Sequence, residues 1–149
     1  MKDVMALCDI VRETSYSIHK YHAHGHLEKV YENALVHRLR KAGLKVNQQC
    51  PLHVYDEDGT EIGDYIADII VEDCLIVELK ACKSISSEHK AQLLGYLRAS
   101  GVEHGLLINF GSFRFQIQKY ALSAPGSSLA GKISSWLLPF FAFSAFFCG

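Results

Sequence analysis

Three charged side chains occur in the most apolar part of the sequence, and their types suit metal chemistry. Asp68 lies in the stretch ADII, and Glu78 and Lys80 follow directly on CLIV. Both stretches are typical of buried strands. Residues two apart on a strand point to the same face, so Glu78 and Lys80 are expected to share one. Burying a bare carboxylate is costly unless it is paired or bound to a metal.

One lysine cannot neutralise two buried carboxylates on adjacent strands, whereas a divalent cation can. Oxygen ligands from Asp and Glu, completed by water, suit Mg²⁺ or Mn²⁺. The alternative is a buried ion pair between Lys80 and either carboxylate, without chemistry. The two carboxylates can share a cation only if they project from one sheet face. We therefore expect a three-residue loop, Glu72 to Cys74, or an equivalent bulge, that pairs Asp68 with Glu78.

Two more pairs of polar residues occur at helical spacing. Glu28 and Tyr31 are three residues apart in GHLEKVY, and Gln92 and Tyr96 are four apart in QLLGY. On a helix each pair shares one face. Each pair alone also fits a structural interpretation: a solvated glutamate on an amphipathic helix, or a half-buried tyrosine beside a surface glutamine.

The elements that must position these residues follow from the hydrophobic periodicity. Helices are expected over about residues 3–21, 27–42 and 86–100. Strands are expected over about residues 46–55, 61–71, 74–82, 104–110 and 113–122. The order is α-α-β-β-β-α-β-β, which predicts an α/β (α+β) fold with a mixed central sheet flanked by helices. The third helix makes a crossover between the strand of Glu78 and the next strand, so these two strands should be parallel.

Taken together, the segments resemble a known family, the GxxExxY proteins. GHLEKVY is similar to the signature that names the family. YIADIIVEDCLIVELKA, AQLLGYL and GLLINFG are similar to its later blocks, in the same order. The resemblance covers residues 3 to about 122. That family belongs to the PD-(D/E)xK nuclease-like superfamily, so the resemblance implies a restriction-endonuclease-like core.

The resemblance also implies roles for the residues above. Asp68, Glu78 and Lys80 match the catalytic motif, and Glu28 matches a helical glutamate that joins Asp68 and Glu78 around the metal. The pair Gln92 and Tyr96 looks like the QxxxY element of the RecB-like exonuclease branch, which implies substrate positioning, a role we extend to Tyr31. The implied cofactor is Mg²⁺ or Mn²⁺, with no small-molecule cofactor.

The function that these roles imply is metal-dependent hydrolysis of phosphodiester bonds in DNA, with RNA as the alternative substrate. In the chemistry of such a reaction, a carboxylate-held cation activates water and neutralises charge on the phosphoryl oxygens. A lysine beside it stabilises developing charge. The competing hypothesis is a non-catalytic nucleic-acid-binding or accessory protein that keeps the nuclease fold.

Composition and charge restrict the classes of partner. The chain has 149 residues and a net charge of −1, so it lacks the overall basic character of many nucleic-acid binders. This weakens a DNA hypothesis without excluding it, because a metal ion can supply local positive charge. Five cysteines with no CxxC pair, together with a polar N-terminus unlike an export signal, indicate reduced thiols in the cytoplasm.

The end of the chain differs in character from the rest. We expect a nuclease-like domain over residues 1–122, a linker over 123–135 and an apolar tail over 136–149. The run from Trp136 to Cys148 holds 13 residues, against about 20 for a helix that spans a bilayer. The favoured interpretation is a tail that packs on the domain or on a partner, a second copy in a homodimer included. An interfacial membrane anchor is less favoured, and an end without function is the remaining alternative.

Overall fold

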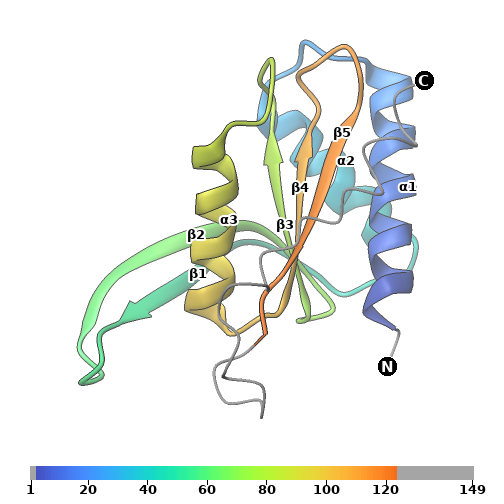
Figure 1. Cartoon of the computed structure of the whole chain (residues 1–149). Helices are drawn as coiled ribbons and strands as arrows, with labels where there is room; N and C mark the ends of the chain where they lie inside the picture. Colours follow the sequence, from blue (N-terminus) through green and yellow to red (C-terminus); the bar gives the residue numbers. More distant parts are fainter. Residues whose placement is uncertain (1–2, 124–149) are drawn as a thin grey trace.

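The computed structural model describes residues 3–123, which form a five-stranded sheet between two layers of helices (Figure 1). In chain order the elements are α1 (Val4–His22), α2 (Glu28–Lys41), β1 (Val46–Tyr55), β2 (Glu61–Val71), β3 (Leu75–Lys80), α3 (Ser87–Ser100), β4 (His104–Asn109) and β5 (Gln116–Ala121). This order confirms the mixed α/β fold expected from the sequence. The expected apolar tail, and the linker beyond residue 123, lie outside the described residues.

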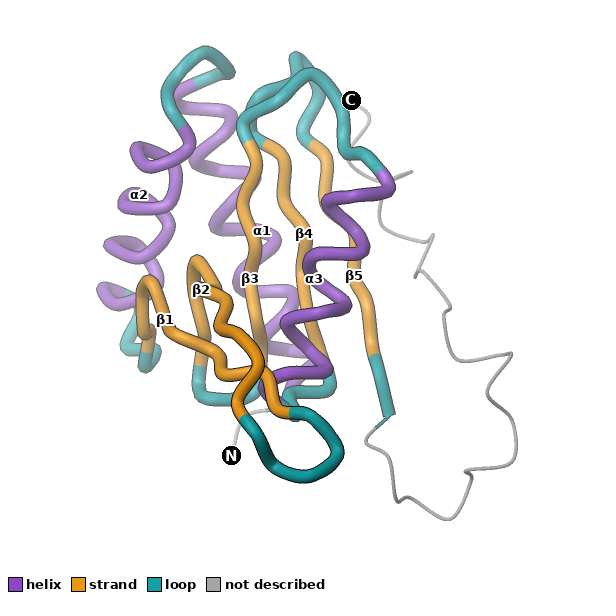
Figure 2. Tube along the Cα trace, turned by 90° about the vertical axis from the view of Figure 1, so that its left-hand side faces the viewer, coloured by secondary structure: helices purple, strands orange, loops and turns teal. Residues whose placement is uncertain are grey.

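The strands lie side by side in the order in which they occur in the chain, β1-β2-β3-β4-β5. Neighbouring strands are antiparallel except β3 and β4, which are parallel and joined by α3. The expected crossover is thus confirmed. Figure 2 shows α3 on the near side of the sheet and α1 on its far side. Within residues 3–123 no helix combines the length and the hydropathy that crossing a bilayer requires.

Two hydrophobic clusters, one on each face of the sheet, form the core of the described residues. The cluster under α1 and α2 includes Leu7, Val11, Leu35, Leu39, Ile69, Leu75, Val77 and Leu79. The cluster under α3 includes Leu52, Ala67, Ile76, Leu93, Tyr96, Leu97 and Leu107. β3 therefore alternates between the two faces. Glu78 and Lys80, two and four residues after Ile76, belong to the face that α3 covers.

The ends of α3 are fixed by local chemistry that the sequence indicates. Ser86 Oγ accepts a hydrogen bond from the His89 N–H at 3.3 Å, and His89 Nδ1 accepts one from the Ser86 N–H at 3.1 Å. This reciprocal capping satisfies two backbone donors that a helix start leaves free. Gly101 ends the helix with a φ of 71°, a left-handed conformation that glycine adopts at low cost. Gln92 and Tyr96 are therefore held inside a well-defined helix.

The loop between β2 and β3 has the predicted length. Val71 pairs with Leu75 across it, so Glu72 to Cys74 form a three-residue loop. The same register pairs Ile69 with Val77. The backbone pairing ends there, one residue short of Asp68 and Glu78, and the side chains of these two residues bond across the strands instead.

The regular alternation of β2 breaks at Asp68. Ala67 packs in the cluster under α3, whereas Ile69, two residues later, packs under α1 and α2. In a regular strand these two residues would share a face. Across from Asp68, Gln49 of β1 has a φ of 54°, between regular pairs on either side. Beyond this point β1 and β2 leave the sheet as a two-stranded arm, residues 50–67, that passes α3 (Figure 1).

Candidate active site

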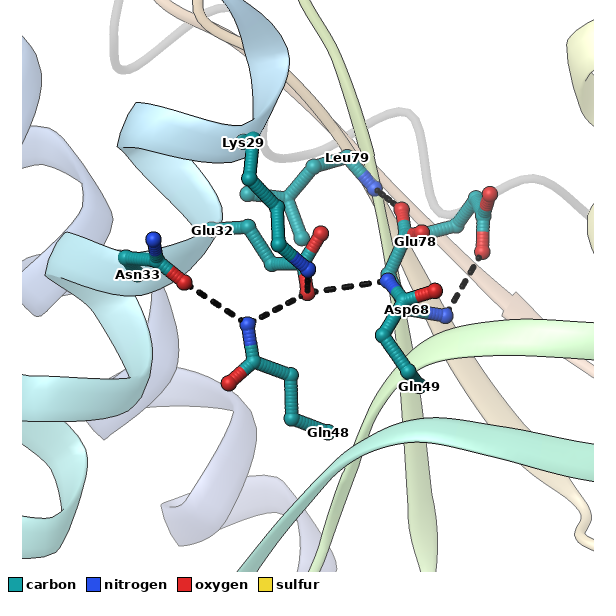
Figure 3. A network of polar contacts seen from close by, with 8 residues as sticks. All are labelled: Lys29, Glu32, Asn33, Gln48, Gln49, Asp68, Glu78 and Leu79. Carbon is teal, nitrogen blue, oxygen red and sulfur yellow. Dashed lines mark hydrogen bonds and ion pairs between the residues drawn. The ribbon is translucent and has the colours of Figure 1, made fainter.

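Asp68 and Glu78 lie where β2 separates from β3, and each carboxylate binds the backbone of the other strand. Asp68 Oδ2 accepts a hydrogen bond from the Leu79 N–H at 2.9 Å, and Glu78 Oε2 accepts one from the Asp68 N–H at 3.4 Å (Figure 3). Both residues are buried. Side-chain oxygens thus take the place of backbone carbonyls at the end of the ladder, which explains how two acids are tolerated there.

Lys80 connects this acid pair to α3. Its Nζ lies 3.7 Å from Glu78 Oε1 and donates a hydrogen bond to Gln92 Oε1 at 2.7 Å. The Lys80 side chain is 15% exposed and the Glu78 side chain 4%. The ammonium group therefore lies at the mouth of the site, between a buried carboxylate and solvent.

Fully ionised, the acid pair would carry more negative charge than one lysine balances. Burial raises the pKa of Glu78 to about 8; the charge of Asp68 adds to this effect and the Lys80 ammonium opposes it. Burial also raises the pKa of Asp68, with the Leu79 N–H opposing the shift and the charge of Glu32 adding to it. Both neighbouring acids resist ionisation, so the binding of a divalent cation between them would be favourable once they are ionised.

Tyr96 lies beside the same carboxylates, on α3. Burial raises its pKa to about 12, and the charges of Glu78 and Asp68 contribute, while a hydrogen bond with Gln92 opposes the shift. The hydroxyl is therefore neutral over the physiological range and available as a donor. The structure thus brings Gln92 and Tyr96 to the acid pair, where the sequence placed them.

Glu28, the first residue of α2, approaches the acid pair from the other side. Burial, and then the charge of Asp68, raise the pKa of this half-buried carboxyl group. The Lys80 ammonium and the backbone N–H of Ala81, just after β3, lower it. Glu28 therefore lies within electrostatic reach of Asp68 and at the end of β3.

Tyr31 has a different place from the one the sequence suggested. Its ring is fully buried and stacks on Phe110, with centroids 4.8 Å apart. Its hydroxyl donates to the Ala23 carbonyl at 2.6 Å and accepts from the His26 N–H at 3.2 Å. A side chain without exposed surface cannot contact a substrate. Tyr31 instead holds the loop from which Glu28 begins α2.

Glu32 is a buried acid that the sequence analysis did not single out. It is 2% exposed, and its Oε1 accepts hydrogen bonds from Gln48 at 2.6 Å and from Gln49 at 2.9 Å (Figure 3). Lys29 Nζ lies 2.9 Å from the same oxygen. The available signal was its spacing, since Glu32 follows Glu28 by four residues and so shares its helix face. Its bond to Gln49 ties α2 to the break in β1 opposite Asp68.

The donor set fits a hydrated divalent cation. Among residues 3–123, no three His, Cys, Asp or Glu side chains lie close enough together to hold a metal ion between them. The site instead offers two adjacent carboxylates, Asp68 and Glu78, with Glu28 nearby. Mg²⁺ is commonly held by one or two carboxylates and keeps several waters, so this set of hard oxygen donors suits it and Mn²⁺.

The profile of the PD-(D/E)XK nuclease superfamily matches residues 5–120. No curated protein matches. The crystal structure of SSO0001 is similar in fold, with a TM-score of 0.51 and 20% sequence identity over 66% of this chain and 50% of that chain. The chain thus spans half the length of that protein.

The superfamily match covers all the elements that carry the site. The matched range includes Glu28, Asp68, Glu78 and Lys80. It also includes helices from both faces of the sheet. Nucleases of this superfamily generally act on nucleic acid with divalent metal ions. The order of helices and strands is that of the restriction-endonuclease-like fold. The chain belongs to the PD-(D/E)XK nuclease superfamily.

Proposed function

We propose that this chain is a metal-dependent nuclease that hydrolyses phosphodiester bonds in DNA, and that residues 1–122 form its nuclease domain. The observation that carries the proposal is the buried Asp68 and Glu78 pair, with the Lys80 ammonium 3.7 Å from Glu78 at the mouth of the site. Within the superfamily we assign the chain to the GxxExxY proteins, on the signature GHLEKVY. The free thiols of the described cysteines support a cytoplasmic location.

In this proposal Asp68 and Glu78 hold Mg²⁺ or Mn²⁺, and Glu28 completes the set from α2. When bound, the cation supplies Lewis acidity toward a phosphoryl oxygen and toward a water molecule. The raised pKa of Glu78 means that this carboxyl group must lose a proton before it can act as a ligand. The Leu79 N–H keeps one oxygen of Asp68 in place, which fixes the direction of the other.

The remaining residues orient the substrate. Gln92 accepts a hydrogen bond from Lys80, which directs the ammonium group toward the space in front of Glu78. There it can stabilise charge that develops on the phosphoryl group or orient the attacking water. The neutral Tyr96 hydroxyl can donate to a phosphate oxygen. Tyr31 acts indirectly, since it holds the loop that precedes Glu28.

The test is a cleavage assay on single-stranded, duplex and branched DNA and on single-stranded RNA, with Mg²⁺, Mn²⁺ or EDTA. We expect cleavage of DNA that requires the metal and is abolished by Asp68→Ala. The exposed Lys83→Ala, just after β3, is the matched control and should retain activity. Metal-dependent cleavage that Asp68→Ala leaves intact would point to a contaminating nuclease and refute the assignment. A parent protein that binds DNA without cleaving it would establish the accessory-protein alternative.

A further inference from the structure

A pair of aromatic side chains extends from the acid pair onto the arm. Tyr65 lies on β2, three residues before Asp68, and its ring centroid is 5.3 Å from that of Tyr96, with the planes inclined by 44°. Tyr96 is 5% exposed, whereas Tyr65 is 45% exposed. The two rings therefore form a short shelf, with its inner end beside the carboxylates and its outer end open to solvent.

The outer ring is supported by α3. The atom closest to where a side chain at Gly95 would begin is Cε2 of Tyr65, at 4.0 Å. The Tyr65 ring therefore lies over α3 at Gly95, one residue before Tyr96, at a distance that would also accommodate a methyl group there. Across the arm Tyr65 pairs with Leu52, which packs under α3. The ring thus contacts Tyr96 and lies over α3, while nearly half of the residue stays accessible.

The charges around the shelf decide which part of a nucleic acid can reach Tyr65. The sequence from residue 46 to residue 79 contains no lysine or arginine. The arm beyond Tyr65 and its tip carry five carboxylates, from Asp56, Glu57, Asp58, Glu61 and Asp64. Basic residues lie at the end of β3 and in the first turn of α3, namely Lys80 and Lys90. A phosphodiester backbone is attracted toward the start of α3 and repelled by the arm.

We infer that Tyr65 is a base-stacking residue, on which an unpaired base of a single-stranded nucleic acid stacks while the adjacent phosphate lies at Asp68 and Glu78. This inference rests on the proposed nuclease function, since it places the scissile phosphate at that site. An aromatic ring among carboxylates suits the uncharged face of a base. Only an unpaired base offers a free face, because bases in a duplex are covered by their neighbours. The second backbone of a duplex would also meet the carboxylates of the arm.

The decisive experiment measures binding without chemistry. Single-stranded oligonucleotides with 2-aminopurine at one position are titrated with the protein in EDTA, so that no cleavage occurs. The variants are Tyr65→Ala, Tyr65→Phe, which keeps the ring, and Tyr55→Ala, which removes another exposed tyrosine of the same hairpin. We expect Tyr65→Ala to abolish the fluorescence change and to weaken binding about tenfold, the usual scale for losing one stacked base. Tyr65→Phe and Tyr55→Ala should behave like the parent.

A second readout separates stacking from a structural role. In Mg²⁺, Tyr65→Ala should raise KM for single-stranded DNA with little change in kcat, and the melting temperature should stay near that of the parent. Equal losses of kcat/KM on single-stranded and duplex DNA would overturn the inference. A fluorescence change that persists in Tyr65→Ala would overturn it too. So would a Phe variant that behaves like Ala. If the parent shows Tyr65-dependent fluorescence but cleaves nothing, the stacking site stands and the nuclease proposal fails.

Discussion

Asp68 and Glu78 each accept a hydrogen bond from the backbone of the opposite strand, Asp68 from the Leu79 N–H and Glu78 from the Asp68 N–H. The exchange occurs at the point where the backbone ladder between β2 and β3 ends. A substitution at either position therefore removes two things at once, a negative charge and a bond between strands. Isosteric changes such as Asp68→Asn and Glu78→Gln keep an acceptor oxygen, and so separate the effect of charge from that of strand pairing.

Metal affinity should depend on pH because Glu78 must give up a proton to bind. Its pKa is raised to about 8 in the metal-free protein. Below that pH we expect the apparent Mn²⁺ affinity to rise about tenfold per pH unit, as one proton is released per ion, and to level off above it. Calorimetry in buffers of different ionisation enthalpy measures the proton release directly. An affinity that is constant from pH 6 to pH 8 would contradict a role for Glu78 as a ligand.

The same group gives the metal-free protein a stability that changes with pH. Its folded pKa of about 8 exceeds the ordinary 4.5, so between these values the folded protein binds a proton that the unfolded chain does not. The contribution of Glu78 to the free energy of unfolding is therefore full below the lower value and lost as pH rises toward the upper one. Melting in EDTA should show this fall, and Glu78→Gln should flatten it. A parent and a Glu78→Gln variant with identical pH profiles would exclude the raised pKa.

Lys80→Met tests whether Lys80 acts in catalysis or only neutralises charge. The substitution keeps the aliphatic stem and removes the ammonium group, so metal should still bind while the cleavage rate falls by roughly 10²–10³. Near neutral pH the metal-free variant should melt close to the parent, because Glu78 can remain protonated there. Lys83→Met, on an exposed residue of the following loop, is the control for charge loss. A Lys80→Met protein that melts far lower, from a parent without cleavage or metal affinity, would identify a structural ion pair.

Glu32→Gln should loosen the junction between α2 and β1. Glu32 Oε1 accepts bonds from Gln48 and Gln49, and an amide in its place offers a weaker, uncharged acceptor. We expect a loss of about 1–3 kcal/mol in the free energy of unfolding, the scale for bonds to a buried charged group. Urea denaturation measures it. Glu28→Gln is the comparison. Glu28 is half-buried at the site, so its substitution should lower metal affinity with little effect on stability. Equal stabilities of the two variants would contradict this division of roles.

Two glycines near the site should respond to alanine in opposite ways. A Cβ at Gly95 meets nothing closer than 4.0 Å, so Gly95→Ala should stabilise α3 by about 0.5–1 kcal/mol. A Cβ at Gly111 would lie 2.2 Å from the Cys82 nitrogen and 2.3 Å from the Ala81 carbonyl carbon. Gly111→Ala should therefore destabilise by about 3 kcal/mol or more. It should also lower activity, since Ala81 donates a hydrogen bond to Glu28. A well-folded, active Gly111→Ala protein would show that this contact can relax.

The sequence predicts the parts of the fold that depend on local patterns. Hydrophobic alternation and apolar runs predict the order of helices and strands along the chain. The requirement that Asp68 and Glu78 share a face predicts the three-residue loop from Glu72 to Cys74. The break at Asp68 could not be predicted in the same way. It depends on Gln49 adopting a positive φ, which glutamine seldom does, and on Glu32 binding its side chain from another element.

In the site, too, local sequence spacing predicts some residue positions, whereas others depend on contacts between distant segments. Gln92 and Tyr96 share a helix face, as their spacing indicates, and the packing of α3 on the sheet brings both to Lys80 and the acid pair. Tyr31 follows an equally regular spacing from Glu28, yet its ring turns into the core against Phe110. Periodicity indicates which residues lie together on a helix, but the partner of that face is set by packing between distant segments. Tyr65 lacked any signal, because its contact with Tyr96 depends on the path of the arm.

The short loop between β2 and β3 also has a consequence for the order of folding. Asp68 and Glu78 are only ten residues apart, and a hairpin of this size closes in microseconds. The parallel pairing of β3 with β4 must wait for the whole of α3 to form and cross over. We therefore expect the acids to meet while still solvated, so that most of the cost of burying their charges arises when α3 docks over them. We expect the docking of α3 to be the step of folding that slows as pH rises.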